Sequence, residues 1–318
     1  MKAQRLKRLI TASATLCLLQ TAGAVAEKYA GEQYTVPVGA RAQALGGATI
    51  AGPFDASAGF WNPAGINQLS GKSLIGMHAE TFGSLLHHDF VGYVNASTDT
   101  SKFLRGWGVS AYFLGGEGVF LTELGGAGRP QVASEEFHGD VALGVSGATE
   151  IGAVRLGATL RLLYSDLVVT TGYGAALDVG ALYAPHERLQ LGLRVRDITS
   201  SYIRYSDFET QTINPTVSPG LMYTYSIEDF TFRGLASGDL RFEGRKFGAQ
   251  YWSGDLSLDT HYGLEVEYLQ RVFLRGGFDV GDLTLGAGVS AGALTVDFAF
   301  LDHDALDDSY RFSAGWQF

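Results

Sequence analysis

Apolar and polar residues alternate along most of this chain. Residues 294–300 place Leu, Val, Phe and Phe at every second position, with Thr, Asp and Ala between them. Residues 310–318 repeat the pattern with Tyr, Phe, Ala, Trp and Phe. A period of two is typical of a β-strand with one apolar face, and the helical period is nowhere as strong. The sequence therefore predicts an all-β protein.

The polar face of these strands indicates a membrane barrel. Residues 154–162 and 189–196 carry Gly, Thr, Gln and Arg on the second face, where a soluble sheet would use Lys freely. Aromatic residues lie near the strand ends, and strands of about 9–11 residues suit a tilted membrane crossing. We therefore predict a transmembrane antiparallel β-barrel in contact with outer-membrane lipid, in the cell outer membrane of a Gram-negative (diderm) bacterium.

The strand count is consistent with such a barrel. Fourteen strands are predicted, and single-chain bacterial barrels have even numbers. The longest connections, 116–136, 198–215 and 238–259, all follow odd-numbered strands, which matches the rule of long outer loops and short periplasmic turns. The predicted strands are 73–82, 88–97, 105–115, 137–148, 154–165, 172–184, 189–197, 216–226, 229–237, 260–269, 271–279, 283–291, 293–301 and 310–318.

The first 26 residues have the three parts of a secretory signal peptide. Four basic residues precede position 9, an apolar stretch follows to Val25, and residues 24–26 (Ala-Val-Ala) form a small-x-small cleavage site. Cleavage there would also remove Cys17, the single cysteine of the chain. We therefore predict export, with residues 1–26 as signal peptide.

Composition and motifs exclude several functions. The chain has 33 acidic against 23 basic residues, so no nucleic acid is expected as a partner. The His-Glu-x-x-His motif and the phosphate loop do not occur in the sequence. Residues 87–89 (His-His-Asp) place two histidines side by side. A metal site or a general base would need further residues beside them, and the spacing of the sequence does not supply these. We predict a non-enzymatic protein without catalytic residues, cofactor or metal.

Charged residues on the polar faces would meet in the lumen. If two strands turn around Gln270, Glu265 and Arg275 lie opposite each other. Buried charges need partners, so we expect a network that holds the barrel in one geometry. Its predicted members are Glu265, Glu267, Arg275, Asp297 and Arg311.

Residues 36–66 precede the first strand and lack its alternation. Within them stand 39–41 (Gly-Ala-Arg), 45–48 (Leu-Gly-Gly-Ala), 55–58 (Asp-Ala-Ser-Ala) and 61–65 (Trp-Asn-Pro-Ala-Gly). This pattern resembles the start of the PorV/PorQ family, which is related to the FadL-type outer-membrane barrels (the FadL/OMPP1 superfamily). The resemblance extends over nearly the whole chain after the signal peptide.

The resemblance implies a barrel of residues 73–318 with residues 27–72 folded into its lumen as a hatch. A barrel of this strand number is too wide for wall side chains alone to fill, so an empty one would be a water channel. Residues of the motif are expected to shape the hatch: Gly46, Gly47, Trp61, Asn62, Pro63 and Gly65.

Three functions remain open. The resemblance favours an accessory or cargo-handling component of type IX-like protein secretion, whose long loops would bind machinery proteins or cargo. The alternative is a FadL-like channel for passive uptake or export of a small hydrophobic ligand, which needs an opening in the wall. Gly115, Gly116 and Gly118 could provide such a lateral gap. The third is a structural surface barrel.

Overall fold

The computed structural model describes residues 28–81, 85–99, 101–126, 128–206, 210–302 and 308–318. The predicted signal peptide, residues 1–26, lies outside the described residues. Within the described ranges, no helix is long and apolar enough to cross a membrane.

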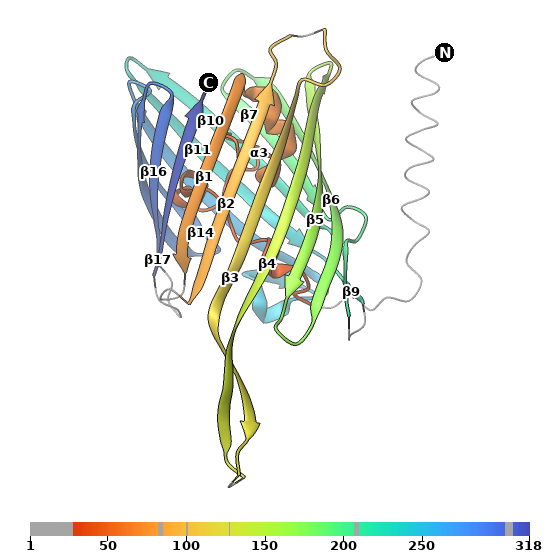
Figure 1. Ribbon diagram of the computed structural model, residues 1–318. Coiled ribbons are helices and arrows are strands. Elements are labelled where there is room, and N and C mark those ends of the chain that lie inside the picture. Colours follow the sequence, from red (N-terminus) through yellow and green to blue (C-terminus); the bar gives the residue numbers. More distant parts are fainter. Residues whose placement is uncertain (1–27, 82–84, 100, 127, 207–209, 303–307) are drawn as a thin grey trace, which may run out of the picture.

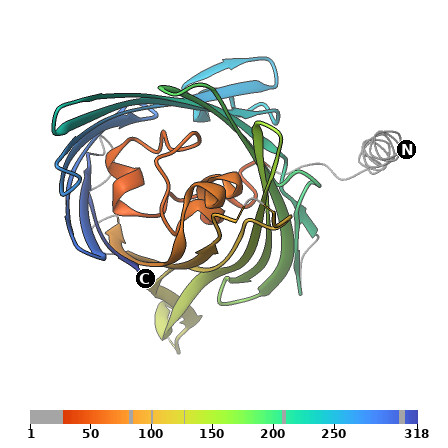
Figure 2. The ribbon, with the colours of Figure 1, turned by 90° about the horizontal axis from the view of Figure 1, so that it is seen from above.

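Fourteen of the described strands form a closed antiparallel barrel, as the alternation predicted (Figures 1 and 2). Each pairs with the next barrel strand, and the first pairs with the last, from Ser73 opposite Gln317 to Glu80 opposite Tyr310. Closure leaves the barrel sheet without a free edge in the bilayer. The barrel strands are β1 (Gly71–Thr81), β2 (Leu86–Ala96), β3 (Gly106–Leu124), β4 (Pro130–Ile151), β5 (Val154–Asp166), β6 (Thr171–His186), β7 (Leu189–Arg196), β10 (Thr216–Ile227), β11 (Phe230–Arg241), β13 (Leu256–Tyr268), β14 (Val272–Asp279), β15 (Asp282–Ala291), β16 (Leu294–Leu301) and β17 (Ser309–Gln317).

The two faces of the barrel follow from the alternation. In β17, Tyr310 and Phe312 are 49% and 56% exposed on the outside, where lipid would cover them. Arg311 and Ser313, between and after them, are each only 4% exposed in the lumen. Apolar side chains therefore face outward and polar ones inward, the reverse of a soluble barrel.

The two ends of the barrel differ. We call the end at which β1 begins and β17 ends the terminal end, and the opposite end, which carries the long β3–β4 hairpin, the hairpin end (Figure 1). Turns at the terminal end are mostly short, such as the two residues between β10 and β11. The hairpin end carries the short additional elements β8 (Tyr202–Tyr205), β9 (Thr210–Thr212), η3 (Lys246–Gly248) and β12 (Tyr251–Ser253).

The prediction that residues 116–136 form a loop is wrong. There β3 and β4 continue beyond the barrel as a paired hairpin (Figure 1). Pairing passes a bulge between Gly116 and Val119 and ends with Leu124 opposite Pro130. Because no lipid faces the strands beyond the membrane, their outer side no longer needs to be apolar, and the signal in the sequence fades. The loop predicted over 238–259 is likewise shorter, since β11 reaches Arg241 and β13 begins at Leu256.

Residues 28–70, which we call the hatch, lie inside the barrel (Figure 2). Glu32 forms an ion pair of 2.6 Å with Arg245, in a loop at the hairpin end. Residue 71 begins β1 at the terminal end, so the hatch runs through the lumen from one end to the other. It contains η1 (Glu32–Tyr34), α2 (Ala40–Ala44), α3 (Ala58–Trp61) and η2 (Pro63–Gln68).

Candidate functional site

Two motif side chains fix the fold of the hatch. The Asn62 side chain is fully buried; its Nδ2 donates to the Ile50 carbonyl at 2.8 Å, and its Oδ1 accepts from the Ala64 amide at 3.1 Å. The indole Nε1 of Trp61 donates to the Val38 carbonyl at 3.0 Å. Pro63 opens η2, where its missing N–H is not needed. These residues contact the backbone of the hatch itself.

Glycines bring the hatch against the barrel wall. Gly46 has φ of 61° and Gly47 has φ of 73°, a left-handed conformation that glycine adopts without strain. A Cβ on Gly46 would overlap the Phe278 carbonyl of β14. Gly65 serves packing within the hatch instead, because a Cβ there would lie 2.5 Å from the ring of Phe54, another hatch residue. In the wall, a Cβ on Gly157 would overlap the backbone of Pro63 and Ala64. Here the hatch touches the wall backbone to backbone.

Glu265 is the centre of a buried charge network. Its carboxylate is 0% exposed and accepts from Arg233 at 2.6 Å and from Arg275 at 2.7 Å. It also pairs with Arg41 of α2, through Nη2 at 2.8 Å and Nε at 3.0 Å. The hatch is therefore ionically tied to the wall.

Two further carboxylates balance the arginines. Arg275 pairs with Asp297 at 2.7 Å, and Arg233 pairs with Glu267 at 2.6 Å. Four of the five predicted network members thus lie in one cluster, with Glu265 opposite Arg275 in the strand register. Sequence analysis missed the roles of Arg41 and Arg233; the position of Arg41 inside the hatch motif was the available signal.

Arg311 lies apart from this cluster. Asp297 is opposite Ser313 rather than Arg311 in the β16–β17 register. The Nη1 atom of Arg311 donates to the Gln43 side chain at 3.0 Å and to the Pro37 carbonyl. It therefore holds a second part of the hatch.

Replacing Arg275 by methionine is expected to lower the unfolding temperature and loosen the hatch. Asp297 would lose its buried cation, whereas Glu265 would retain Arg41 and Arg233. A hydrogen bond to a buried charged group contributes about 1.5–3 kcal/mol, and the loss should lie in this range. Heat-dependent gel mobility and protease resistance measure it; unchanged values for both would contradict the role of Arg275.

A cavity of about 400 Å³ lies at the hairpin end, between the hatch and the wall. The hatch lines it with the apolar residues Val36, Pro37, Ile50, Phe60 and Trp61 and with the polar residues Glu32, Gln33 and Thr35. The opposite side is mostly polar and comes from β7, β10, β11, β13 and β14. We call it the hairpin-end cavity; its apolar side chains come mostly from the hatch, and most of its charged ones come from the barrel, which forms its charged wall.

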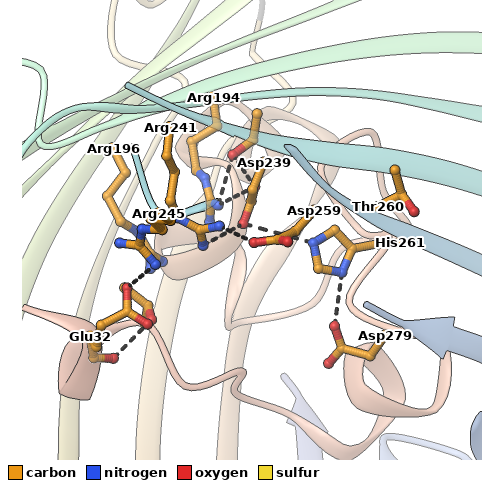
Figure 3. A network of polar contacts seen from close by, with 12 residues as sticks. Glu32, Arg194, Arg196, Asp239, Arg241, Arg245, Asp259, Thr260, His261 and Asp279 are labelled. Carbon is orange, nitrogen blue, oxygen red and sulfur yellow. Dashed lines mark hydrogen bonds and ion pairs between the residues drawn. The ribbon is translucent and has the colours of Figure 1, made fainter. Parts of the chain in front are cut away.

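The charged wall is a second ion network that the sequence did not reveal as a unit (Figure 3). Arg194 and Arg241 lie 3.6 Å and 3.4 Å from Asp239, and the guanidinium of Arg196 lies 4.6 Å from the centroid of the Phe60 ring. Each of these charged side chains occupies a lumen-facing position on its own strand. The side-by-side pairing of β7, β10, β11 and β13 then places them together. Arg241 also pairs with Asp259, and His261 with Asp279.

A second cavity of about 210 Å³ lies at the terminal end. Leu69, Leu74, Phe273 and Trp316 give it an apolar part, and Arg41 of the charge network also lines it. We call it the terminal-end cavity. The hatch separates it from the hairpin-end cavity.

Gly115, Gly116 and Gly118 lie where β3 leaves the barrel. Pairing of β3 with β2 ends at Gly115, opposite His87, and its pairing with β4 shifts after Gly116. Gly118 has φ of 92°. The three glycines thus form a bulge at the rim of the wall, and a lateral gap here stays a prediction.

Comparison with solved structures places this fold among outer-membrane barrels. One similar structure is the CymD monoaromatic hydrocarbon channel, with a TM-score of 0.57 and 12% sequence identity over 89% of this chain and 98% of that one. Another is the toluene transporter TodX of Pseudomonas putida, with a TM-score of 0.51 and 12% identity over 87% of this chain and 96% of that one.

The sequence comparisons add no family. No protein-family model matches the chain, and no curated protein matches it. The structural likeness, at 12% identity, shows the barrel fold, and the PorV/PorQ resemblance is not supported by it. Both similar structures are named as channel or transporter rather than as enzyme.

Proposed function

We propose that this protein is an outer-membrane channel for the passive passage of small hydrophobic molecules. The observation that carries this proposal is the hairpin-end cavity, into which the hatch contributes the apolar and aromatic residues Ile50, Phe60 and Trp61. Its volume of about 400 Å³ falls within the ~300–1,000 Å³ usual for small-molecule sites. The likeness to channels named for monoaromatic hydrocarbons supports the same class of ligand.

The hatch separates this cavity from the β2–β3 wall. Phe60 lines the cavity on one side and packs at 6.3 Å, between ring centroids, against Phe90 of β2 and Tyr112 of β3 on the other. The Tyr112 hydroxyl also donates to the Gln33 carbonyl at 2.5 Å. A molecule in the cavity therefore reaches neither the β2–β3 wall nor the terminal-end cavity unless the hatch shifts.

We further propose that molecules leave sideways, through the bulge of Gly115, Gly116 and Gly118. Pairing of β3 with β2 ends at this bulge, so β2 no longer holds β3 beyond it. An apolar molecule that enters the bilayer there avoids transfer into water. The charge network and Arg311 would set how readily the hatch moves.

A disulfide between hatch and wall tests this mechanism. A Cβ on Gly59 of α3 would lie 3.3 Å from the Cβ of Ser146 in β4, close to the ~3.5–4.5 Å of a disulfide. The chain's single cysteine is Cys17, in the predicted signal peptide, so no other thiol should compete. We expect oxidised Gly59→Cys/Ser146→Cys protein to lose hydrophobic uptake, and a reductant to restore it.

The measurement is initial uptake of radiolabelled toluene by diderm cells that express the protein, with a small sugar as polar reference. Each single-cysteine variant serves as control, because neither can form the bond. Uptake by the oxidised double variant at the wild-type rate would contradict the need for hatch movement. Toluene uptake equal to that of cells without the protein would contradict the channel function itself.

The protruding hairpin favours a second candidate, the secretion accessory that the PorV/PorQ resemblance implied. Phe120, Leu124 and Val132 on it are 56%, 77% and 62% exposed, as a protein-binding surface would be. Purification of the tagged protein from its native membrane in mild detergent, with mass spectrometry, separates the candidates. Stoichiometric secretion machinery or cargo would support secretion, and a co-extracted apolar molecule alone would support the channel. If neither is recovered, the third function, a structural surface barrel, is the one supported.

A further inference from the structure

Two histidines and a glutamate meet at the hairpin end of the first two strands. His78 and Glu80 belong to β1, and His87 belongs to β2. In the register of these strands, Glu80 is opposite His87 and His78 is opposite Asp89. Two cross-strand pairs thus lie next to each other on two paired strands.

These side chains stand on the outside of the barrel. Ala79 and Thr81, which alternate with them, are 1% and 4% exposed because they face the lumen. The His78 side chain is 53% exposed and that of Asp89 is 48% exposed. The cluster therefore lies at the outer rim of the wall, away from both cavities.

The three residues have the composition of a transition-metal site. One ligand atom from each of His78, Glu80 and His87 lies within 4.8 Å of the other two. The two imidazole rings are nearly parallel, at 21°, with centroids 6.2 Å apart. Imidazole and carboxylate are preferred ligands of Zn²⁺, whereas Ca²⁺ and Mg²⁺ prefer oxygen alone. Among the residues with described placement, no other cluster satisfies this geometry.

Asp89 orients the imidazole of His78 in a way that suits a metal ligand. The Nδ1 atom of His78 lies 2.8 Å from the Asp89 carboxylate. An ionised carboxylate only accepts hydrogen bonds, so the imidazole proton lies on Nδ1 and Nε2 keeps its lone pair. Carboxylate–histidine–metal arrangements of this kind orient the ring and raise its basicity. This contact is independent of the spacing among the three ligands.

We propose that His78, Glu80 and His87 bind one divalent transition-metal ion of the zinc type, with water in the fourth position. Tetrahedral ligands about 2.0–2.1 Å from zinc lie about 3.3 Å apart, so the side chains need to approach by only a small rotation. Their exposure at a strand end permits this. Sequence analysis predicted no metal, because spacing alone does not reveal that His87 lies opposite Glu80, next to the His78–Asp89 pair, on two paired strands.

Metal binding here would join β1 to β2 beside the seam of the barrel. On the other side of β1, Glu80 is opposite Tyr310 and His78 is opposite Phe312 of the last strand. An ion that binds the folded state alone stabilises it in proportion to the logarithm of its concentration over Kd. Zinc should therefore raise the unfolding temperature of the barrel.

The test uses detergent-purified protein with an affinity tag that contains no histidine. Cobalt(II) titration followed by visible absorption, and zinc titration by calorimetry, should each give one saturable site per chain. We expect His78→Ala and His87→Ala to abolish it, and Asp89→Asn to weaken affinity about 10–100-fold. The matched control is His186→Ala, which removes an exposed histidine at the terminal end.

Heat-dependent gel mobility confirms that each variant is folded, and thermal unfolding with and without zinc gives the second readout. Zinc should raise the unfolding temperature of wild type and His186→Ala but not of His87→Ala. Wild type without a saturable site would overturn the proposal. So would His78→Ala and His87→Ala variants that bind as tightly as wild type.

Discussion

Replacing Glu265 by glutamine is expected to lower the free energy of unfolding by about 3–5 kcal/mol, the usual cost of removing one partner from a buried ion pair. Glu265 is fully buried and pairs with Arg41, Arg233 and Arg275. Glutamine keeps the size and removes the charge, so three guanidinium groups would face each other with Glu267 and Asp297 as the remaining carboxylates of the cluster. The hatch, held through Arg41, should loosen first.

Urea unfolding followed by gel mobility measures this loss, and limited proteolysis at residues 28–70 reports the hatch separately. The control is Glu150→Gln, whose carboxylate is 34% exposed and lies 3.8 Å from Arg155. An exposed pair of this kind contributes at most about 1 kcal/mol. Equal losses in both variants would contradict a special role for Glu265.

Replacing Gly157 by valine should displace the hatch and open the lumen to ions. The new Cβ would overlap the backbone of Pro63 and Ala64, which cannot rotate away as a side chain could. Overpacking costs about 1–3 kcal/mol even where side chains adjust. Because strand pairing does not involve the hatch, the barrel should persist with a wider passage, and single-channel conductance in planar bilayers should rise clearly above wild type.

A matched substitution separates hatch displacement from damage to the wall. Gly234 of β11 has no atom within 4 Å of a built Cβ, so Gly234→Val adds the same side chain without a clash. It should conduct as wild type does. A Gly157→Val protein with wild-type conductance and a protected hatch would show that the hatch is not seated on this glycine.

The barrel itself could be predicted because each strand carries its own signal. In β16, Val296 and Phe298 face lipid and Asp297 faces the lumen, a pattern that the membrane and the lumen both enforce. The hairpin beyond the membrane lacked that signal. Gly115 and Gly116 interrupt the alternation, and past them pairing between β3 and β4 alone stabilises the strands.

The site was less predictable, since its contacts join distant parts of the chain. Glu265 and Arg275 could be paired in advance because one short turn connects their strands. Arg41 reaches the same carboxylate across 224 residues, and its partner depends on how the hatch folds. The register of a neighbouring strand also decides a pairing: Asp297 lies opposite Ser313, so Arg311 binds the hatch instead.

The path of the hatch constrains the order of assembly. Residues 28–70 traverse the whole lumen and continue directly into β1, one side of the seam with β17. Had the seam closed first, the N-terminal end of the chain would have to thread lengthwise through a finished cylinder, and chain threading is very rare in proteins. We therefore expect the hatch to be enclosed while the cylinder is still an open sheet. Union of the first and last strands would then be the final step of biogenesis, with the wall closing around the hatch.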